Sequence, residues 1–250
     1  MSYADDVSGA DRHPPLAGAK ARPASAKTPT SGVGNSRIVF QSTRPALFAT
    51  LLTVLAGTLD AAAYIELNHL YVSFMSGNST HLGMVLAAGA LPDILAVITI
   101  ILAFVVGASV GTFIADRAGR HMPTAVLGAE ALLVLIAVVL ALCGGAHTAL
   151  VLIAIAMGAQ NVLHQVIAGA DVGKGFITGA LFGLGQSVAR LFRDEGAAAR
   201  SASNMLSWCA FVGGAAAGTL CLASLGLVGC LVAAAFLILV LLIAALARWL

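Results

Sequence analysis

From residue 45 onward, the chain is a succession of apolar stretches separated by short polar breaks. A helix that crosses a membrane needs about 20 apolar residues at 1.5 Å per residue. Eight stretches of about that length can be drawn, at 45–66, 71–91, 94–115, 123–143, 147–168, 173–192, 203–222 and 225–247. Since only 10% of the residues are charged, the chain cannot cover a soluble surface. The sequence predicts an all-α polytopic membrane protein.

Residues 1–43 differ from the rest in being rich in Pro, Ser, Gly and Ala, with isolated charges and no apolar run. We expect a disordered tail, because such a composition cannot form a packed core. No apolar core follows a basic start, so the pattern is not that of a signal peptide. The basic residues nearest the first stretch, Arg37 and Arg44, favour a cytoplasmic N-terminus.

The two halves of the apolar region share three motifs in the same order. Gly57-Thr-Leu-Asp60 corresponds to Gly158-Ala-Gln-Asn161, Phe74-Met-Ser-Gly77 to Phe176-Ile-Thr-Gly179, and Phe104-x-x-Gly107-x-x-x-Gly111 to Phe211-x-x-Gly214-x-x-x-Gly218. One such match in a sequence rich in Gly and Ala would be noise, but three in order indicate a duplication. We predict two homologous four-segment membrane repeats, at 44–143 and 144–250, after the tail at 1–43.

The stretches 71–91 and 173–192 are too rich in glycine and polar residues for plain lipid-facing helices. If they are re-entrant or broken, six full spans remain and Arg117, Arg120 and Lys174 fall on the cytoplasmic side, as the positive-inside tendency prefers. Three crossings per unit would invert the second unit, as in many transporters. The alternative is eight full spans, which places these three residues outside.

The motif Gly57-Thr-Leu-Asp60-Ala61, followed by Phe74-Met-Ser-Gly77-Asn78-x-x-x-Leu82-Gly83, resembles the YoaK-like family of bacterial polytopic membrane proteins, a domain of unknown function. The motifs at 158–161 and 178–185 are similar to that family too. Ser76 stands where the family usually has Thr, which keeps the hydroxyl. The resemblance covers about residues 45–247 and implies a multi-pass protein of the bacterial inner membrane. It implies no activity.

Polar residues within the apolar stretches are the candidates for a substrate pathway. Asp60 lies about 15 residues into the first stretch, where a carboxylate costs about 2.5–3.5 kcal/mol to insert, so it should face a cavity or a partner. The structural alternative is that Asp60 caps a helix that ends early. The pathway candidates are Asp60, Ser76, Gly77, Asn78, His81, Asn161, Thr178 and Gly179.

The run from Ser76 to His81 has two interpretations: a half-helix that aims free N–H groups at a solute, or a polar face bonded to neighbouring helices. Glu130, in the fourth stretch, would join the pathway if it lies deep. The helix-packing candidates are Gly107, Gly111, Gly214 and Gly218, with dimerisation as the alternative.

We expect a transporter or channel for an unidentified small solute. The alternative is a membrane scaffold or regulatory protein, and an intramembrane enzyme ranks last, because no nucleophile elbow, His-Glu-x-x-His motif or phosphate loop is found. The formal charge of +2 gives no basic face for nucleic acid, and the four cysteines lack metal-site spacing, so we expect no cofactor or metal. The lipid bilayer is the expected partner, and the sequence leaves a homo-oligomer open.

Overall fold

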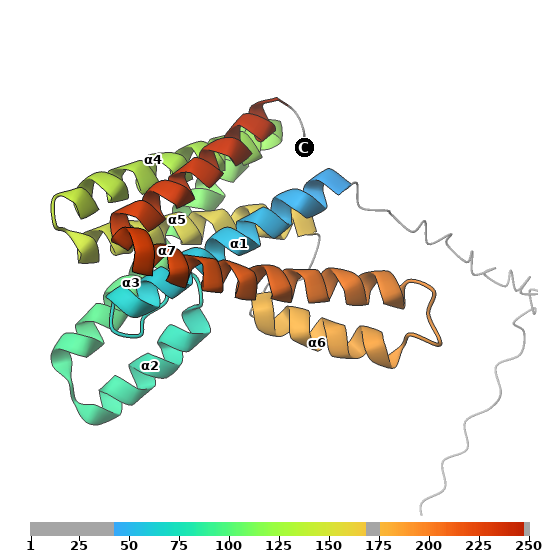
Figure 1. Ribbon diagram of the computed structural model, residues 1–250, viewed down its shortest axis with the longest axis horizontal. Coiled ribbons are helices and arrows are strands. Elements are labelled where there is room, and N and C mark those ends of the chain that lie inside the picture. Colours follow the sequence, from blue (N-terminus) through green and yellow to red (C-terminus); the bar gives the residue numbers. More distant parts are fainter. Residues whose placement is uncertain (1–42, 169–175, 248–250) are drawn as a thin grey trace, which may run out of the picture. The chain divides into compact units, whose positions relative to one another are not determined.

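The computed structural model describes residues 43–168 and 176–247, and this part of the chain is helical apart from short connections (Figure 1). The all-α membrane class agrees with the sequence. The helices are α1 Thr43–Glu66, α2 Met75–Ala88, α3 Leu91–Ala118, α4 Met122–Leu142, α5 Ala146–Ala168, α6 Phe176–Ala189 and α7 Ala197–Leu246, with the 3-10 turn η1 Gly119–His121 between α3 and α4.

The predicted number of membrane crossings is wrong. Within the described residues, four helical segments are long and apolar enough to cross a membrane, fewer than the six spans we expected or the alternative of eight. They are Ala46–Glu66, Leu91–Leu142, Ala146–Leu163 and Ala197–Leu246. The argument for an inverted second unit assumed three crossings per unit, and it loses that basis.

The way in which the apolar stretches are joined explains the correction. The stretches 94–115 and 123–143 lie on α3 and α4, which η1 joins into one apolar segment of 52 residues, and 203–222 and 225–247 lie on the two helical parts of α7, which meet at Gly226. The stretches 71–91 and 173–192 contain only the 14-residue helices α2 and α6. At 1.5 Å per residue, 14 residues reach about 21 Å, short of the roughly 30 Å of hydrocarbon.

Gly226 is the point at which α7 changes direction, as the ribbon shows (Figure 1). Its φ is 68° and its ψ is −178°, a backbone conformation that is essentially open to glycine alone. The sequence shows a Gly within an apolar run there, but hydropathy does not distinguish a kink from a loop. A side chain at this position would be strained.

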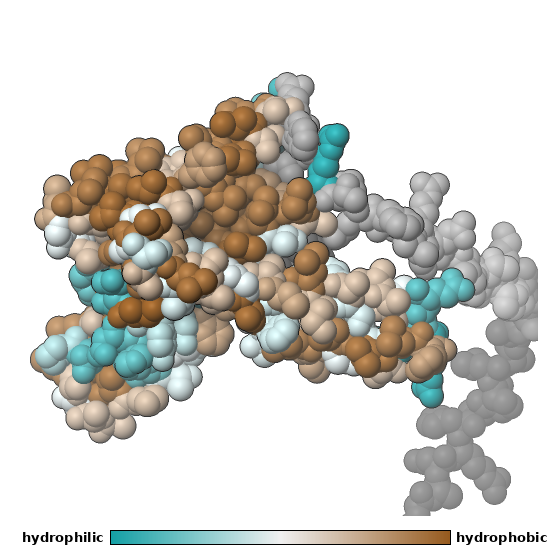
Figure 2. All heavy atoms as spheres, viewed as in Figure 1, coloured by the Kyte–Doolittle hydropathy of each residue, from teal (hydrophilic) through white to brown (hydrophobic). Residues whose placement is uncertain are grey.

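Large apolar side chains fill the contacts between helices and also cover the outside. α1 packs on α7, α3 on α5, and α4 on both α5 and α7, while α2 lies along α3 and α6 along α7. Leu52, Ile100, Leu127 and Ile153 are among the residues fully buried in the core. Apolar side chains also dominate much of the face seen in Figure 2, and exposed apolar surface on this scale suits contact with lipid tails.

The contact between α1 and α7 depends on glycine. A Cβ atom on Gly214 or Gly218 would overlap the backbone of Val54 or Thr58. In the reverse direction, a Cβ atom on Gly57 of α1 would overlap the backbone of α7. The close approach lets the Thr58 hydroxyl donate a hydrogen bond to the Gly214 carbonyl oxygen at 3.0 Å. Backbone contact of this kind replaces the hydrophobic drive that lipid cannot supply.

The contact between α3 and α5 also depends on glycine. A Cβ atom on Gly107 would overlap the backbone of Ile155, and one on Gly111 would lie 2.6 Å from the Cα atom of Ala159. Conversely, a Cβ atom on Gly158 of α5 would overlap the backbone of α3. Each of the two glycine pairs that the sequence marks for helix packing therefore lies against another helix of the same chain.

Candidate functional site

The buried carboxylate of Asp60, on α1, holds the segment that joins α1 to α2. The side chain is 2% exposed. Its Oδ1 accepts hydrogen bonds from the backbone N–H of Val72 at 2.8 Å and of Ser73 at 2.7 Å. Its Oδ2 accepts the Ser73 hydroxyl at 2.6 Å. The Asp60 carboxylate thus satisfies backbone donors that a low-dielectric environment would otherwise leave without partners.

Asn78 holds the same segment from α2. Its side chain is fully buried, its Oδ1 accepts the Tyr71 N–H at 2.9 Å, and its Nδ2 donates to the Tyr71 carbonyl at 2.7 Å. One side chain therefore pairs both backbone polar groups of one residue. We call Asp60, Ser73, Asn78 and the backbone of residues 71–73 the polar clamp.

Aromatic rings pack beside the polar clamp. The Tyr71 ring centroid lies 5.1 Å from that of Tyr64 and 5.2 Å from that of Phe74. A Cβ atom on Gly77 would lie 2.6 Å from the Phe74 ring and 2.9 Å from the Tyr71 ring, so the aromatic packing requires glycine there. Partial burial, together with Tyr64 and Asp60, raises the pKa of the Tyr71 hydroxyl, which therefore stays protonated at neutral pH.

The other polar residues of α2 point away from the clamp. Ser76 is exposed and His81 is half-buried. The exposed Ser79 and Thr80 donate their hydroxyls to carbonyls of their own helix, at 2.8 and 3.1 Å. Hydrophilic side chains gather over the connection between α1 and α2 and over the adjoining part of α2 (Figure 2). Of the run from Ser76 to His81, Gly77 and Asn78 take part in this packing.

The candidates from the second half are not joined to the clamp. The amide of Asn161 donates to the Met157 carbonyl of its own helix at 2.8 Å. Thr178 is exposed and Gly179 is half-buried on α6. Among the described residues, no hydrogen bond links these three to the polar clamp. Lys174, on which the topology argument partly depended, lies outside the described residues.

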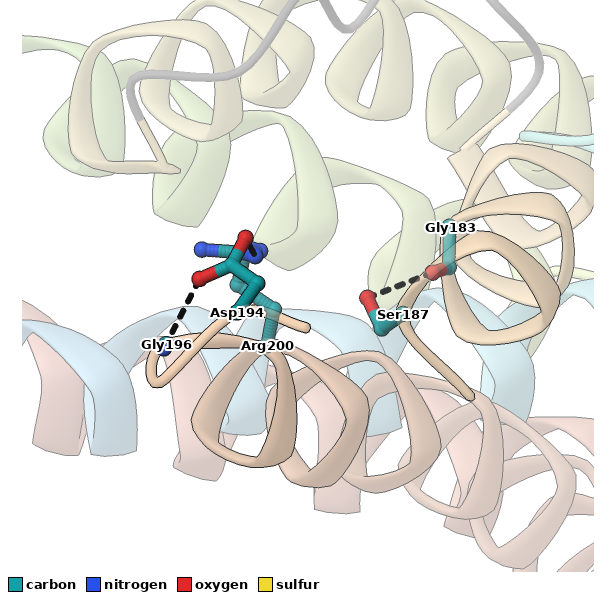
Figure 3. Close-up of polar contacts among 5 residues, drawn as sticks. All are labelled: Gly183, Ser187, Asp194, Gly196 and Arg200. Carbon is teal, nitrogen blue, oxygen red and sulfur yellow. Dashed lines mark hydrogen bonds and ion pairs between the residues drawn. The ribbon is translucent and has the colours of Figure 1, made fainter. Parts of the chain in front are cut away.

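The turn from α6 to α7 is held by polar contacts at the surface (Figure 3). Asp194 pairs with Arg200 and accepts the Gly196 N–H at 2.9 Å, and these two hydrogen bonds lower the pKa of the Asp194 carboxyl. Within α6, the Ser187 hydroxyl donates to the Gly183 carbonyl at 2.7 Å. The exposed ion pair of Asp194 with Arg200 orders the turn and contributes little to the stability of the fold.

Glu130, on α4, is the buried carboxylate that the list of pathway candidates omits. Its side chain is 0% exposed, and neither carboxylate oxygen has a hydrogen-bond partner in the described part of the chain. The signal in the sequence was its place inside the fourth apolar stretch. No group of three or more His, Cys, Asp or Glu side chains among the described residues could hold a metal ion.

Comparison with known proteins decides the family. Residues 48–244 match the family described as "Protein of unknown function (DUF1275)". The chain belongs to this family. A curated relative is "UPF0700 transmembrane protein YoaK" of Bacillus subtilis (strain 168), which is 27% identical over 151 residues, covering 57% of this chain and 67% of the relative. No solved structure matches. The resemblance to the YoaK-like family is confirmed, and the protein is a membrane protein of that family.

Proposed function

We propose that the protein moves a small solute across the bacterial inner membrane, with its N-terminus in the cytoplasm. The observation that carries the proposal is a pair of short helices in corresponding places. α2 and α6 each contain 14 residues, each precedes a long apolar helix, and each packs along that helix. Unusually short helices at matching positions of two halves are a good pointer to the binding site of a transporter.

The glycine contacts support the two-repeat organisation on which this argument depends. Motif partners are offset by 101 residues between α1 and α5 and by 107 between α3 and α7. Under these offsets, three glycine contacts of α1 with α7 have counterparts between α5 and α3. The contact of Gly57 with Phe211 matches that of Gly158 with Phe104. In the same way, the contact of Val54 with Gly214 matches that of Ile155 with Gly107, and the contact of Thr58 with Gly218 matches that of Ala159 with Gly111.

Movement of one repeat against the other would then open the site to each side in turn. The polar clamp fixes the start of α2 to α1, so α1 and the beginning of α2 would move together. Asp60 and Asn78 act as positioning residues in this mechanism, because their hydrogen bonds go to the chain itself. A solute would contact the groups that the clamp holds in place.

The test is flux into vesicles that contain the purified protein, with a panel of small ions, amino acids, organic acids and sugars. We expect at least one solute to enter faster than in protein-free vesicles. A Gly77→Ala variant should slow that flux, because the added methyl displaces the Phe74 and Tyr71 rings. Gly83→Ala, on the same helix, is the matched control, because the added methyl has no atom within 4 Å. Absence of flux across the whole panel would contradict the proposal.

A scaffold or regulatory role is the second candidate, and the internal hydrogen bonds of Asp60 and Asn78 favour it. If the clamp serves folding alone, Asp60→Asn and Asn78→Ala reduce the folded yield, and no solute is transported by any variant. If the protein is a transporter, material of either variant that does fold shows altered flux per folded molecule. Flux normalised to folded protein therefore separates the two roles.

A further inference from the structure

Glu130 lies on the buried face of α4, and apolar residues form the rest of that face. Val126, Leu127, Val134 and Ala137 are all fully buried with it. The helix packs mainly against α5 and α7. Glu130 is eight residues from the first residue of α4, about 12 Å along the helix axis at 1.5 Å per residue. The carboxyl group is therefore well inside an apolar helical segment.

A carboxyl group without partners is costly in either protonation state. An ionised carboxylate in an apolar site is strongly destabilised unless it is paired and hydrogen-bonded. The neutral acid is destabilised much less, because it carries no charge and loses only the hydrogen bonds of its polar atoms. The surroundings of Glu130 therefore favour the neutral acid, in which a bound proton neutralises the charge of the carboxylate.

Among the described residues, the helices that pack against α4 place no charged side chain in the buried core beside Glu130. The charged and titratable side chains on them that are exposed are Asp93, Asp116 and Arg117 of α3, Arg120 and His121 of η1, His147 of α5, and Arg200 and Cys209 of α7. Cys221 is half-buried and Cys230 is buried, both on α7. The side chain of His164, on α5, lies outside the described residues. The described surroundings of Glu130 are therefore uncharged.

The buried face of α4 has a counterpart without a carboxylate. Buried residues at the same spacing occur on the second part of α7, where Cys230, Leu231, Ala234, Ile238 and Leu241 match Val126, Leu127, Glu130, Val134 and Ala137. The two helices pack against each other. Ala234 stands at the position that corresponds to Glu130. An apolar side chain therefore serves the packing at this position, and the carboxylate of Glu130 is not needed for it.

We propose that Glu130 is a proton-binding site, a neutral carboxylic acid that releases its proton when α4 moves relative to α5 and α7. In the closed arrangement the proton stays on the carboxyl group because no water or base reaches it. In an arrangement that admits water, the acid ionises and the proton leaves to solvent. Coupling of that exchange to a solute rests on the proposed transport function, whereas proton binding itself does not.

The direct test is infrared spectroscopy of the full-length protein in lipid nanodiscs near neutral pH. A protonated carboxylic acid has a carbonyl band distinct from those of amides and carboxylates. We expect wild type to show this band and Glu130→Gln to lack it. The band should persist in Glu66→Gln, whose carboxyl is exposed at the end of α1, and in His164→Gln. A wild-type spectrum identical to that of Glu130→Gln in this region would overturn the proposal.

Labelling by dicyclohexylcarbodiimide gives an independent readout, because this apolar reagent adds to protonated carboxyl groups and mass spectrometry locates the adduct. We expect the adduct on Glu130 and not on Asp60 or Glu66. Glu130→Leu has no carboxyl group at this position, so it should fold as well as wild type and lose the adduct. Labelling of Asp60 in place of Glu130 would contradict the proposal.

The flux assay separates this inference from the proposed function. If wild type transports a solute and a pH gradient drives its accumulation, Glu130→Gln should lose accumulation while downhill exchange remains. If Glu130→Gln still accumulates solute under the gradient, proton coupling through Glu130 is refuted while transport stands. If no solute moves but the infrared band is present, the proposed function fails and the proton-binding site stands.

Discussion

Two carboxylates, Asp60 and Glu130, are buried in the described part of this protein, and they differ in their hydrogen bonding. Asp60 is 2% exposed and accepts three hydrogen bonds from the connection between α1 and α2. Glu130 is 0% exposed, and its oxygens have no partner among the described residues. Burial alone would rank the two as equal candidates for a functional role. The hydrogen bonds of Asp60 show that it positions the chain, whereas the lack of hydrogen bonds to Glu130 is the basis for the proton-binding role that we propose for it.

The difference has an energetic consequence. Hydrogen bonds to a charged group are worth about 1.5–3 kcal/mol each, so the three that Asp60 accepts offset part of the penalty of burying it. Glu130 has no such compensation, and its burial is a net loss for the fold. Residues that cost stability without a structural return are frequent at functional sites.

The largest expected effect is that of Asp60→Leu. The substitution removes both acceptor oxygens, and with them all three hydrogen bonds, and leaves the N–H groups of Val72 and Ser73 without a partner. We expect a loss of about 3–5 kcal/mol in the free energy of unfolding, measured by denaturant titration in mixed micelles. Asp60→Asn keeps one acceptor oxygen and should lose less than half as much. Equal losses would show that hydrogen bonding is not what Asp60 contributes.

Asn78→Ala should have the next largest effect. It removes both hydrogen bonds to the Tyr71 backbone, and the expected loss is about 2–4 kcal/mol in the same titration. Ser76→Ala is the matched control on the same helix turn, where an exposed substitution should change stability by about 0.5 kcal/mol or less. If Asn78→Ala behaved like Ser76→Ala, the clamp would depend on Asp60 alone.

Glu130→Leu should change stability in the opposite direction. It removes unsatisfied polar atoms and leaves an apolar side chain of similar size in an apolar face. We expect a gain of about 1–2 kcal/mol in the free energy of unfolding, or at least no loss. A loss comparable to that of Asp60→Leu would mean that Glu130 has structural partners, and the comparison between the two carboxylates would fail.

Ser73→Ala should have the smallest effect on stability. It sharpens the comparison because it takes the Ser73 hydroxyl away from one oxygen of the Asp60 carboxylate, so that Asp60 becomes more like Glu130, whose oxygens have no donor among the described residues. One hydrogen bond to Oδ2 is lost, while the two backbone N–H groups still bond to Oδ1. The expected loss is about 1–1.5 kcal/mol. Thermal unfolding of this variant alone and combined with Asp60→Asn would show whether the two residues are coupled, since the losses would then not add.

Hydropathy located the helices well where each is a single apolar run. The stretches at 45–66, 123–143 and 147–168 agree with α1, α4 and α5 to within a few residues. At 71–91 the sequence predicted a re-entrant or broken segment but did not show the irregular connection at 71–74, which side chains distant in sequence hold. Near Gly226 it predicted two spans, 203–222 and 225–247, where the structure has the two parts of α7 meeting at a kink. Tertiary partners and backbone angles have no periodic signal in a single sequence.

The site was predictable only in part for the same reason. The sequence named Asp60 and Asn78 from their position in apolar stretches, but nothing in it showed that both hold residues 71–73. It suggested Glu130 as a pathway residue only if the position was deep. Whether a buried carboxylate has donors depends on which helices surround it. α4 packs against α5, the next helix along the chain, and against α7, from the C-terminal part of the chain.

The most direct test of the central claim is the free energy of unfolding of Asp60→Leu and Glu130→Leu in the same micelles. Both replace a buried carboxylate by the same apolar side chain, so the comparison isolates what each carboxylate contributes. The account predicts opposite signs, with Asp60→Leu less stable and Glu130→Leu as stable as wild type or more so. Similar losses in both variants would contradict it.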